Sequence, residues 1–310
     1  MEKCLIVIFL IAIITSCNKD EKESGIETIP CYVTQIDFVW EENCDNNPWQ
    51  ETSRFSFYYD ENNQIEKWLL HNHSTYFVYY NEQSQKVKKV EVFRNGELKQ
   101  YFNFVWEQNR LTTNRFFADG SIYDYSGKMI FELNNSGEPL KIESFDYIEG
   151  TWELGWYQIL NWQAGNLLKS ESYYKIEKIS NDFTCNNAKP LRFNYVDNSN
   201  IEIDINKSTE EFIKVSSVEI EYDDTNNPLN INHFVIWFSD YQVSSEYGAP
   251  FPTKNNPIES RAYYLWNDMD ILQTFSYEFN DNNYPVNQRI YYQINHCEYI
   301  IENRFAYKCN

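Results

Sequence analysis

The chain repeats one pattern along most of its length: an alternating strand, a turn rich in Asn, Asp or Gly, and another strand. Near its start, Phe55, Phe57 and Tyr59 fall on one face of such a strand, because successive side chains point to opposite faces. Turn signals recur about every dozen residues between Asn62 and Asp119, a spacing typical of all-β hairpin chains. No segment sustains the 3.6-residue apolar period of a helix, so we expect little helix.

A longer repeat is superimposed on this alternation. It consists of an aromatic or apolar residue, an acidic or amide turn, and an apolar residue followed by a polar one. Its related copies occupy residues 58–67, 79–89, 105–113, 132–142, 161–170, 221–231 and 278–288. Asn95-Gly96 and Asp119-Gly120 are predicted two-residue hairpin turns, whose central positions both need a positive φ. We therefore predict an all-β domain over residues 30–310, a large antiparallel up-and-down meander of hairpins, closed or curled into a barrel.

These hairpins resemble YD repeats. They are more closely similar to those of a family of uncharacterised Bacteroidota outer-membrane lipoproteins whose domain is described as porin-like. The resemblance covers most of the chain after the signal, and its best marks are NNPLNI at 226–231, NNYPVNQ at 282–288 and the ending at Cys309. It implies a large antiparallel barrel or a strongly curled sheet. Because these motifs are turns, the resemblance implies no catalytic residue.

The N-terminus predicts a lipoprotein signal peptide over residues 1–16. A short charged start is followed by the apolar run 5–14, which is too short to span a bilayer as a helix. The lipobox residues before the cysteine are Ile14, Thr15 and Ser16. Cys17 is therefore the predicted lipid attachment site, so a palmitate-type lipid anchor in the outer membrane is expected.

Residues 17–29 are polar and charged, and we predict a flexible tether. Lys19-Asp20-Glu21 resembles the acidic signal that sends Bacteroidota lipoproteins to the cell surface, although an ordinary charged linker explains it equally well. Alternation alone does not distinguish a barrel in water from a barrel in lipid. The anchor, the polar ending at 307–310 and the tyrosines on polar faces favour water.

The net charge of −20 excludes one class of partner. Such a surface repels phosphate backbones, so we expect no nucleic-acid ligand.

Five cysteines remain after the signal and the lipidated residue, namely Cys31, Cys44, Cys185, Cys297 and Cys309. An exported chain can keep disulfides, and an odd number leaves at least one thiol free. Cys31 with Cys44 and Cys297 with Cys309 are the short-loop pairings. Cys31 with Cys309 would instead join the two ends of a closed sheet. Spacing alone does not choose among them.

Residues for catalysis or metal binding form no recognisable motif. His71 and His73 would point to one strand face, as in a metal site, but they flank a turn residue and are better explained as solvated side chains. The acidic turns 223–227 and 280–283 lack the ligand spacing of a calcium loop, and Asn and Asp favour turns without a metal. We predict no enzyme, no metal and no cofactor.

The strongest candidates for recognition are four aromatic residues near Gly150 and Gly155, namely Tyr147, Trp152, Trp156 and Tyr157. Exposed aromatic rings stack on sugars. However, strict alternation places Trp152, Leu154 and Trp156 on one face, which is typical of a core, so both interpretations stay open.

Our leading hypothesis is a non-catalytic, surface-anchored lipoprotein that binds a glycan, peptide or protein partner through its loops. The alternative is a lipocalin-like carrier that encloses an apolar ligand, and an envelope hydrolase ranks last.

Overall fold

The computed structural model describes residues 31–44, 47–70, 74–175, 212–227, 253–264, 269–294 and 297–309. These residues form strands and turns. The strands are β1 (Cys31–Cys44), β2 (Asn47–Tyr59), β3 (Ile65–Leu70), β4 (Ser74–Tyr80), β5 (Val87–Arg94), β6 (Glu97–Glu107), β7 (Arg110–Phe117), β8 (Lys128–Leu133), β9 (Pro139–Ile148), β10 (Thr151–Gln163), β11 (Asn166–Lys175), β12 (Phe212–Asn226), β13 (Asn255–Tyr264), β14 (Met269–Phe279), β15 (Pro285–Ile294) and β16 (Cys297–Cys309). No helix in these ranges has the length and hydropathy needed to cross a membrane.

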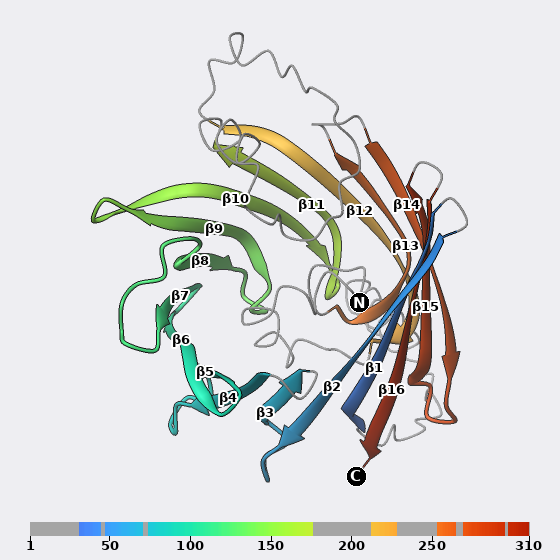
Figure 1. Ribbon diagram of the computed structural model, residues 1–310, viewed down its shortest axis with the longest axis horizontal. Helices are drawn as coiled ribbons and strands as arrows, with labels where there is room; N and C mark the ends of the chain where they lie inside the picture. Colours follow the sequence, from blue (N-terminus) through green and yellow to red (C-terminus); the bar gives the residue numbers. More distant parts are fainter. Residues whose placement is uncertain are drawn as a thin grey trace, which may run out of the picture. The chain divides into compact units, whose positions relative to one another are not determined.

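The strands form a closed barrel in which each strand lies beside its sequence neighbours, and β16 lies beside β1 (Figure 1). Consecutive strands from β1 to β16 pair antiparallel, as in the register of Gln35 with Ser56 between β1 and β2 or of Ile290 with Ile301 between β15 and β16. The predicted all-β up-and-down meander is therefore confirmed, in its closed form. Closure pairs every strand on both sides, so no described strand is an edge.

One face of each strand is buried and the other is partly exposed. In β2, Phe55 and Phe57 are buried, whereas the alternate residues are not. In β5, Val90 and Val92 are fully buried between residues that reach solvent. A closed single-layer sheet can shield only its inner side, so the buried residues mark the inner face. The apolar alternation of the sequence is thus directed inward.

A row of aromatic hydrogen bonds runs around one rim of the barrel, where even-numbered strands end and odd-numbered strands begin. We call this the turn rim. In every even-numbered strand except β8, a Tyr hydroxyl or Trp indole NH donates to a backbone carbonyl near the start of the preceding strand. The pairs are Tyr59–Val33, Tyr80–Ile65, Trp106–Val87, Trp162–Pro139, Tyr222–Leu167, Tyr277–Pro257 and Tyr307–Pro285, at 2.5–3.0 Å. The equivalent position of β8 is Leu133, which has no donor.

The longer sequence repeat coincides with this rim. Each copy that lies wholly in the described residues spans the end of an even-numbered strand, a turn and the start of the next strand. The Asp60 carboxylate accepts hydrogen bonds from the backbone NH groups of Asn62 and Gln64. The Asn280 side chain does the same for Asn282 and Tyr284. The acidic and amide residues therefore fix the turns by bonding their own backbone.

At the opposite rim, which we call the far rim, one predicted turn is confirmed and one is wrong. Asn95 and Gly96 have φ values of 54° and 79°, as a two-residue turn requires. Asp119 is not left-handed; only Gly120 is, with φ 86°. The reason is that residues 118–127 form a longer connection, in which the NH of Ser126 donates to the buried carboxylate of Asp146 at 2.6 Å.

Two parts of the inner face differ in chemistry. Along β2–β9 most of the buried residues are apolar, with Trp68, Leu111 and Phe131 fully buried, although Ser74, Gln100, Thr113, Ser144 and Asp146 are buried there as well. Along β13–β16 buried polar side chains lie among the apolar ones. There, Ser260 donates to Gln273, Gln288 donates to the Tyr277 hydroxyl, and Asn303 donates to Gln288. We refer to these as the apolar arc and the polar arc.

A disulfide joins Cys44, at the end of β1, to Cys297, at the start of β16. This pairing excludes both short-loop pairings, Cys31–Cys44 and Cys297–Cys309, because it uses one cysteine of each. Cys31 is also disulfide-bonded, while Cys185 lies outside the described residues. Cys44 and Cys297 can pair because closure of the barrel places β1 beside β16, although the two cysteines are 253 residues apart in the sequence.

Candidate functional site

Three of the four predicted recognition residues lie on the outer face of β9 and β10. Tyr147 pairs with Trp152, and Glu143 pairs with Tyr157. Their inward neighbours on β9 are the buried Ser144 and Asp146. Tyr147, Trp152 and Tyr157 therefore point outward, and each is partly exposed. We call them the outer aromatic residues.

Trp156 lies on the other face, so the prediction that it shares a face with Trp152 and Leu154 is wrong. The register of β10 against β9 shifts between Leu154 and Trp156, which marks a β-bulge at Gly155. A bulge inserts one residue and reverses the alternation beyond it. Trp156 consequently packs against the inner core and stacks on Tyr174, with ring centroids 6.1 Å apart.

The outer aromatic residues already contact neighbouring side chains. Tyr157 stacks on Tyr173 of β11 at 4.7 Å with the rings 8° from parallel. The Lys141 ammonium lies 5.4 Å from the Tyr157 ring centroid, and the Lys128 ammonium lies 5.7 Å from that of Trp152. These rings thus form cross-strand pairs with lysines beside them, on an extended part of the sheet.

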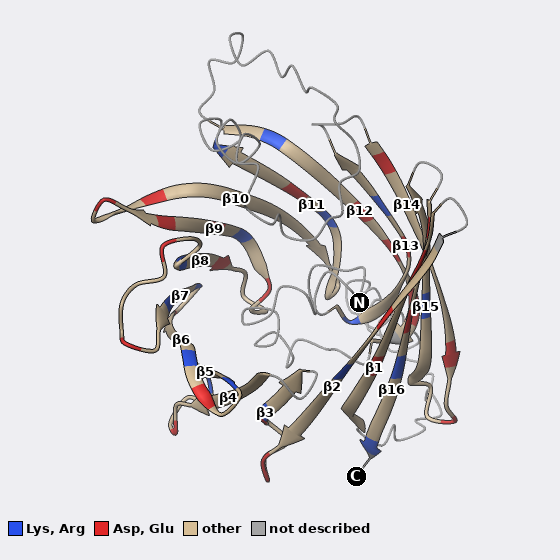
Figure 2. Ribbon diagram, in the orientation of Figure 1, with Lys and Arg blue, Asp and Glu red and all other residues tan. Residues whose placement is uncertain are grey.

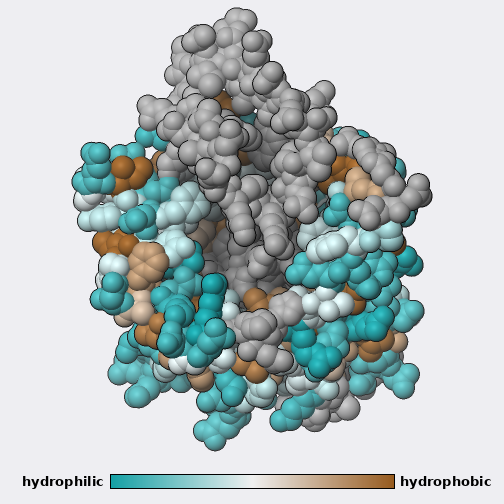
Figure 3. Space-filling view, in the orientation of Figure 1, coloured by the Kyte–Doolittle hydropathy of each residue, from teal (hydrophilic) through white to brown (hydrophobic). Residues whose placement is uncertain are grey.

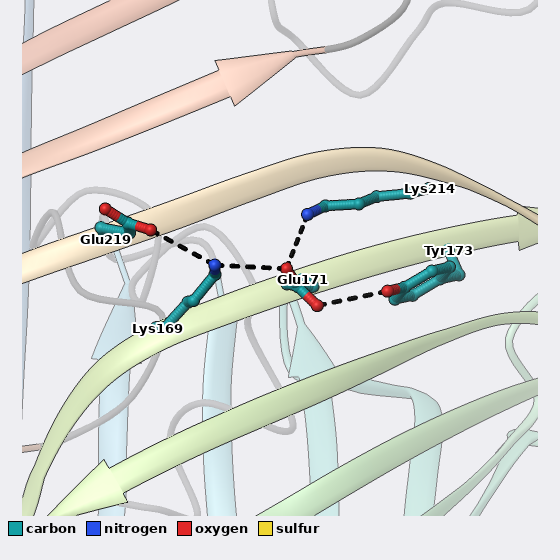
Figure 4. A network of polar contacts seen from close by, with 5 residues as sticks. All are labelled: Lys169, Glu171, Tyr173, Lys214 and Glu219. Atoms are coloured by element: carbon teal, nitrogen blue, oxygen red, sulfur yellow. Dashed lines mark hydrogen bonds and ion pairs between the residues drawn. The ribbon is translucent and has the colours of Figure 1, made fainter.

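A network of charged side chains continues this surface across β11 and β12 (Figure 4). Glu171 contacts Lys214 at 2.6 Å and Lys169 at 3.4 Å, and Lys169 also reaches Glu219 at 3.3 Å. The Tyr173 hydroxyl donates to Glu171. Hydrogen bonding from Lys214 lowers the pKa of the Glu171 carboxyl. Tyr173 therefore links the two groups, because its ring stacks on Tyr157 and its hydroxyl donates to the ion-paired Glu171.

Charges on the rest of the described surface are spread over many strands and turns (Figure 2). Among the residues that are coloured in Figure 3, most are hydrophilic, and apolar residues are scattered between them. Ion pairs lie within strands as well as near turns, as between Lys89 and Glu91 or Lys141 and Glu143. The described outer face thus combines charged and polar residues with aromatic pairs and with single exposed aliphatic residues such as Val105 and Leu272.

A second group of residues lies on the inner face near the far rim, where β1 and β16 meet. We call it the seam cluster. It comprises Trp40 and Glu42 of β1, Trp49 of β2, Tyr292 of β15 and Tyr299 of β16. Glu42 pairs in register with Trp49, and Tyr292 pairs with Tyr299. Sequence reasoning missed this cluster, because its members come from opposite ends of the chain. The useful signal was Cys44 and Cys297 beside these residues, since a closed sheet brings them together.

The rings of the seam cluster pack closely. Trp40 and Trp49 are 5.9 Å apart and nearly perpendicular, at 80°. Tyr292 stacks on Tyr299 at 4.8 Å, and Trp40 lies 6.5 Å from Tyr299. Burial above all, with a smaller contribution from the Glu42 charge, raises the pKa of the Tyr299 hydroxyl.

Potential metal ligands gather at one place among the residues that the structure describes, namely Glu42, Cys44 and Cys297. The two sulfur atoms form the disulfide, so neither is a thiolate that could bind a metal. His71, His73, His233 and His296 lie outside the described residues, as do Cys17 and the lipobox.

No protein-family model matches the chain, and no curated protein matches it. The chain is similar in structure to a porin-like protein from Bacteroides uniformis, with 9% identity, a TM-score of 0.37, and coverage of 89% of this chain and 98% of the other. A porin-like protein from Bacteroides vulgatus gives 10% identity, a TM-score of 0.37, and coverage of 90% and 99%. A protein with unknown function from Bacteroides fragilis gives 11% identity, a TM-score of 0.28, and coverage of 35% and 86%.

Proposed function

We propose that the chain is a non-catalytic binding protein of the outer membrane, anchored at the cell surface by a lipid on Cys17. The lipobox before Cys17 and the polar segment 17–29 support the anchor and the tether. The hairpin turns that resemble YD repeats serve the scaffold, because their acidic and amide side chains bond their own backbone.

In this proposal the barrel stands in water and does not span the membrane. Its buried apolar side chains are directed inward, although apolar residues such as Val105, Leu140 and Ile159 are exposed on the outer face. Lysine–glutamate pairs occupy the middle of outer strand faces, as at Lys89 and Glu91. A lysine on the lipid face of a membrane barrel costs about 2–4 kcal/mol at the bilayer midplane. The distribution of charge therefore favours a barrel held to the membrane only by its anchor.

The ligand in this proposal is a glycan, bound on the outer face of β9–β11. The observation that carries it is the run of outward aromatic rings formed by Tyr147, Trp152, Tyr157 and Tyr173. Rings of this kind give apolar faces for sugar rings, and the ammonium groups of Lys128 and Lys141 beside them are donors for sugar hydroxyl groups. A peptide or protein ligand on the same surface is the other outcome that a binding screen would reveal.

The packing of the inner face favours this surface binder over the lipocalin-like carrier. Large side chains such as Trp68, Phe55 and Phe131 are fully or almost fully buried on the inner face. A carrier of an apolar ligand needs small inward residues and an enclosed space. In the apolar arc, the described inner face instead carries large side chains that contact one another.

The test is a screen of the full-length chain, in a non-ionic detergent, against an array of polysaccharides. Trp152→Ala and Tyr157→Ala are each expected to weaken binding of any positive glycan by about tenfold, since each removes a stacking surface. Tyr101→Ala is the matched control, because Tyr101 stacks on Phe116 at 5.1 Å on the outer face of β6 and β7. Equal losses in all three variants, or no binding to any glycan, would contradict the proposal.

A second measurement tests the anchor. Cells expressing the chain with a labelled palmitate precursor should incorporate label into it, and Cys17→Ala should abolish the incorporation. Label retained in that variant would place the lipid elsewhere.

A further inference from the structure

We propose that the seam cluster is a binding site for an organic cation of the alkylammonium class, separate from the outer aromatic residues. Three features of the cluster support such a site: its ring geometry, its carboxylate without a counter-ion among the described residues, and its indole NH without an acceptor there.

The first feature is the geometry of Trp40 and Trp49. Their ring planes are almost perpendicular, and Trp49 is 42% exposed, so the pair presents ring surface to solvent. Trp is the aromatic residue that attracts cations most strongly through its ring face. Glu42 lies directly opposite Trp49 in the β1–β2 register. Aromatic faces beside a carboxylate form the arrangement that proteins use to bind alkylated ammonium groups.

The second feature is that Glu42 has no proton donor among the described residues. The Cys44 sulfur lies 3.1 Å from its carboxylate, but that sulfur is in the disulfide and carries no hydrogen. A partly buried carboxylate without a hydrogen bond is costly, and a bound cation would compensate its charge.

The cations of the surrounding strands are directed away from Glu42. In the described residues of β1, β2, β14, β15 and β16, all four lysines and arginines, Arg54, Arg289, Arg304 and Lys308, are exposed at outward positions. Arg54 is paired with Asp37 across the outer face. The inner side of the seam is therefore acidic and aromatic without a basic side chain from these strands.

The third feature is the Trp40 indole. Its Nε1 atom is buried and has no hydrogen-bond partner in the described part of the chain. A buried donor without an acceptor is destabilising, because it has lost its hydrogen bond to water. A ligand that carries an oxygen near its ammonium group, as choline does, supplies that acceptor.

The probe is choline, titrated into the full-length oxidised chain in a non-ionic detergent and followed by tryptophan fluorescence and calorimetry. The neutral analogue 3,3-dimethyl-1-butanol has the same shape without the charge. We expect saturable binding of one choline per chain, and binding of the analogue that is weaker by about tenfold or more. No saturable choline signal, or equal affinity for the two compounds, would overturn the proposal.

Two variants locate the site. Glu42→Gln keeps the size of the side chain and removes its charge, and we expect choline affinity to fall about tenfold. Glu41→Gln is the matched control, because the neighbouring Glu41 points outward and bonds Gln50; its affinity should not change. Equal losses in both variants would mean that the cation responds only to the overall negative charge. Trp49→Ala should weaken choline binding by a similar factor, and thermal unfolding of each variant checks that it is folded.

Discussion

The apolar arc and the polar arc bury their inner faces by different means. In the apolar arc, Trp68 stacks on Tyr76 at 4.6 Å, and burial comes from ring and aliphatic contacts. In the polar arc, Asn303, Gln288 and Tyr277 form a row of hydrogen bonds across three strands. The first arrangement tolerates imperfect geometry but loses contact area with every atom removed. The second loses little area, but depends on each donor keeping its acceptor.

The largest expected effect is in the apolar arc. Trp68→Ala should lower the free energy of unfolding by about 3–5 kcal/mol, because the side chain is fully buried and leaves a large cavity. Chemical denaturation followed by circular dichroism measures this. Val105→Ala, on the exposed outer face of β6, should change it by less than about 0.5 kcal/mol. A loss below about 1 kcal/mol in the Trp68 variant would mean that this part of the inner face is not tightly packed.

The polar arc should respond differently to removal of one partner and of two. Gln288→Leu leaves the buried Asn303 amide without an acceptor, so we expect a loss of about 1–3 kcal/mol. The double variant Gln288→Leu with Asn303→Leu removes donor and acceptor together and also the Asn303 Oδ1 atom, which already lacks a partner. The double variant should therefore be more stable than the single one in the same denaturation experiment. The reverse order would show that the row is not the stabilising element.

The row of aromatic hydrogen bonds at the turn rim is common to both arcs, so it should give equal effects in each. Tyr80→Phe in the apolar arc and Tyr307→Phe in the polar arc each remove one hydroxyl bond to a carbonyl. We expect each to cost about 0.5–1.5 kcal/mol. If the losses of unfolding free energy in the two variants differ from each other by more than the width of this range, the surrounding arc, and not the bond, determines the effect.

The smallest expected effect lies outside both arcs, in the charged network of β11 and β12. Lys214 lowers the pKa of Glu171, so their interaction stabilises the fold above the unfolded pKa of Glu, about 4.3, and is lost as the pH falls through the lowered value. Lys214→Gln should cost less than about 1 kcal/mol at neutral pH and nothing well below pH 4. Lys308→Gln removes an equal charge from an exposed position and controls for net charge. Denaturation at the two pH values gives the comparison, and a Lys214→Gln loss that does not depend on pH would contradict it.

The sequence predicted the barrel, but it did not predict the inward position of Trp156 or the contacts between β1 and β16 that form the disulfide and the seam cluster. Alternation and turn chemistry are local, so the strands and turns followed from short segments such as 55–60 and 95–96. The position of Trp156 depends on a bulge at Gly155, and glycine in a strand does not by itself specify a bulge. The Cys44–Cys297 disulfide and the seam cluster depend on which strands close the barrel, which no short segment encodes.

Closure also determines how the barrel would carry a mechanical load. An even number of antiparallel strands places Cys31, where β1 begins, at the same rim as the end of β16. A pull on the chain before Cys31 acts along β1, so the hydrogen bonds to β2 and to β16 are sheared together and are not opened one at a time. At the far end of β1, Cys44 is covalently bonded to β16. The strand nearest the proposed tether is therefore held by hydrogen bonds along both of its sides and by a covalent bond to β16 at its far end.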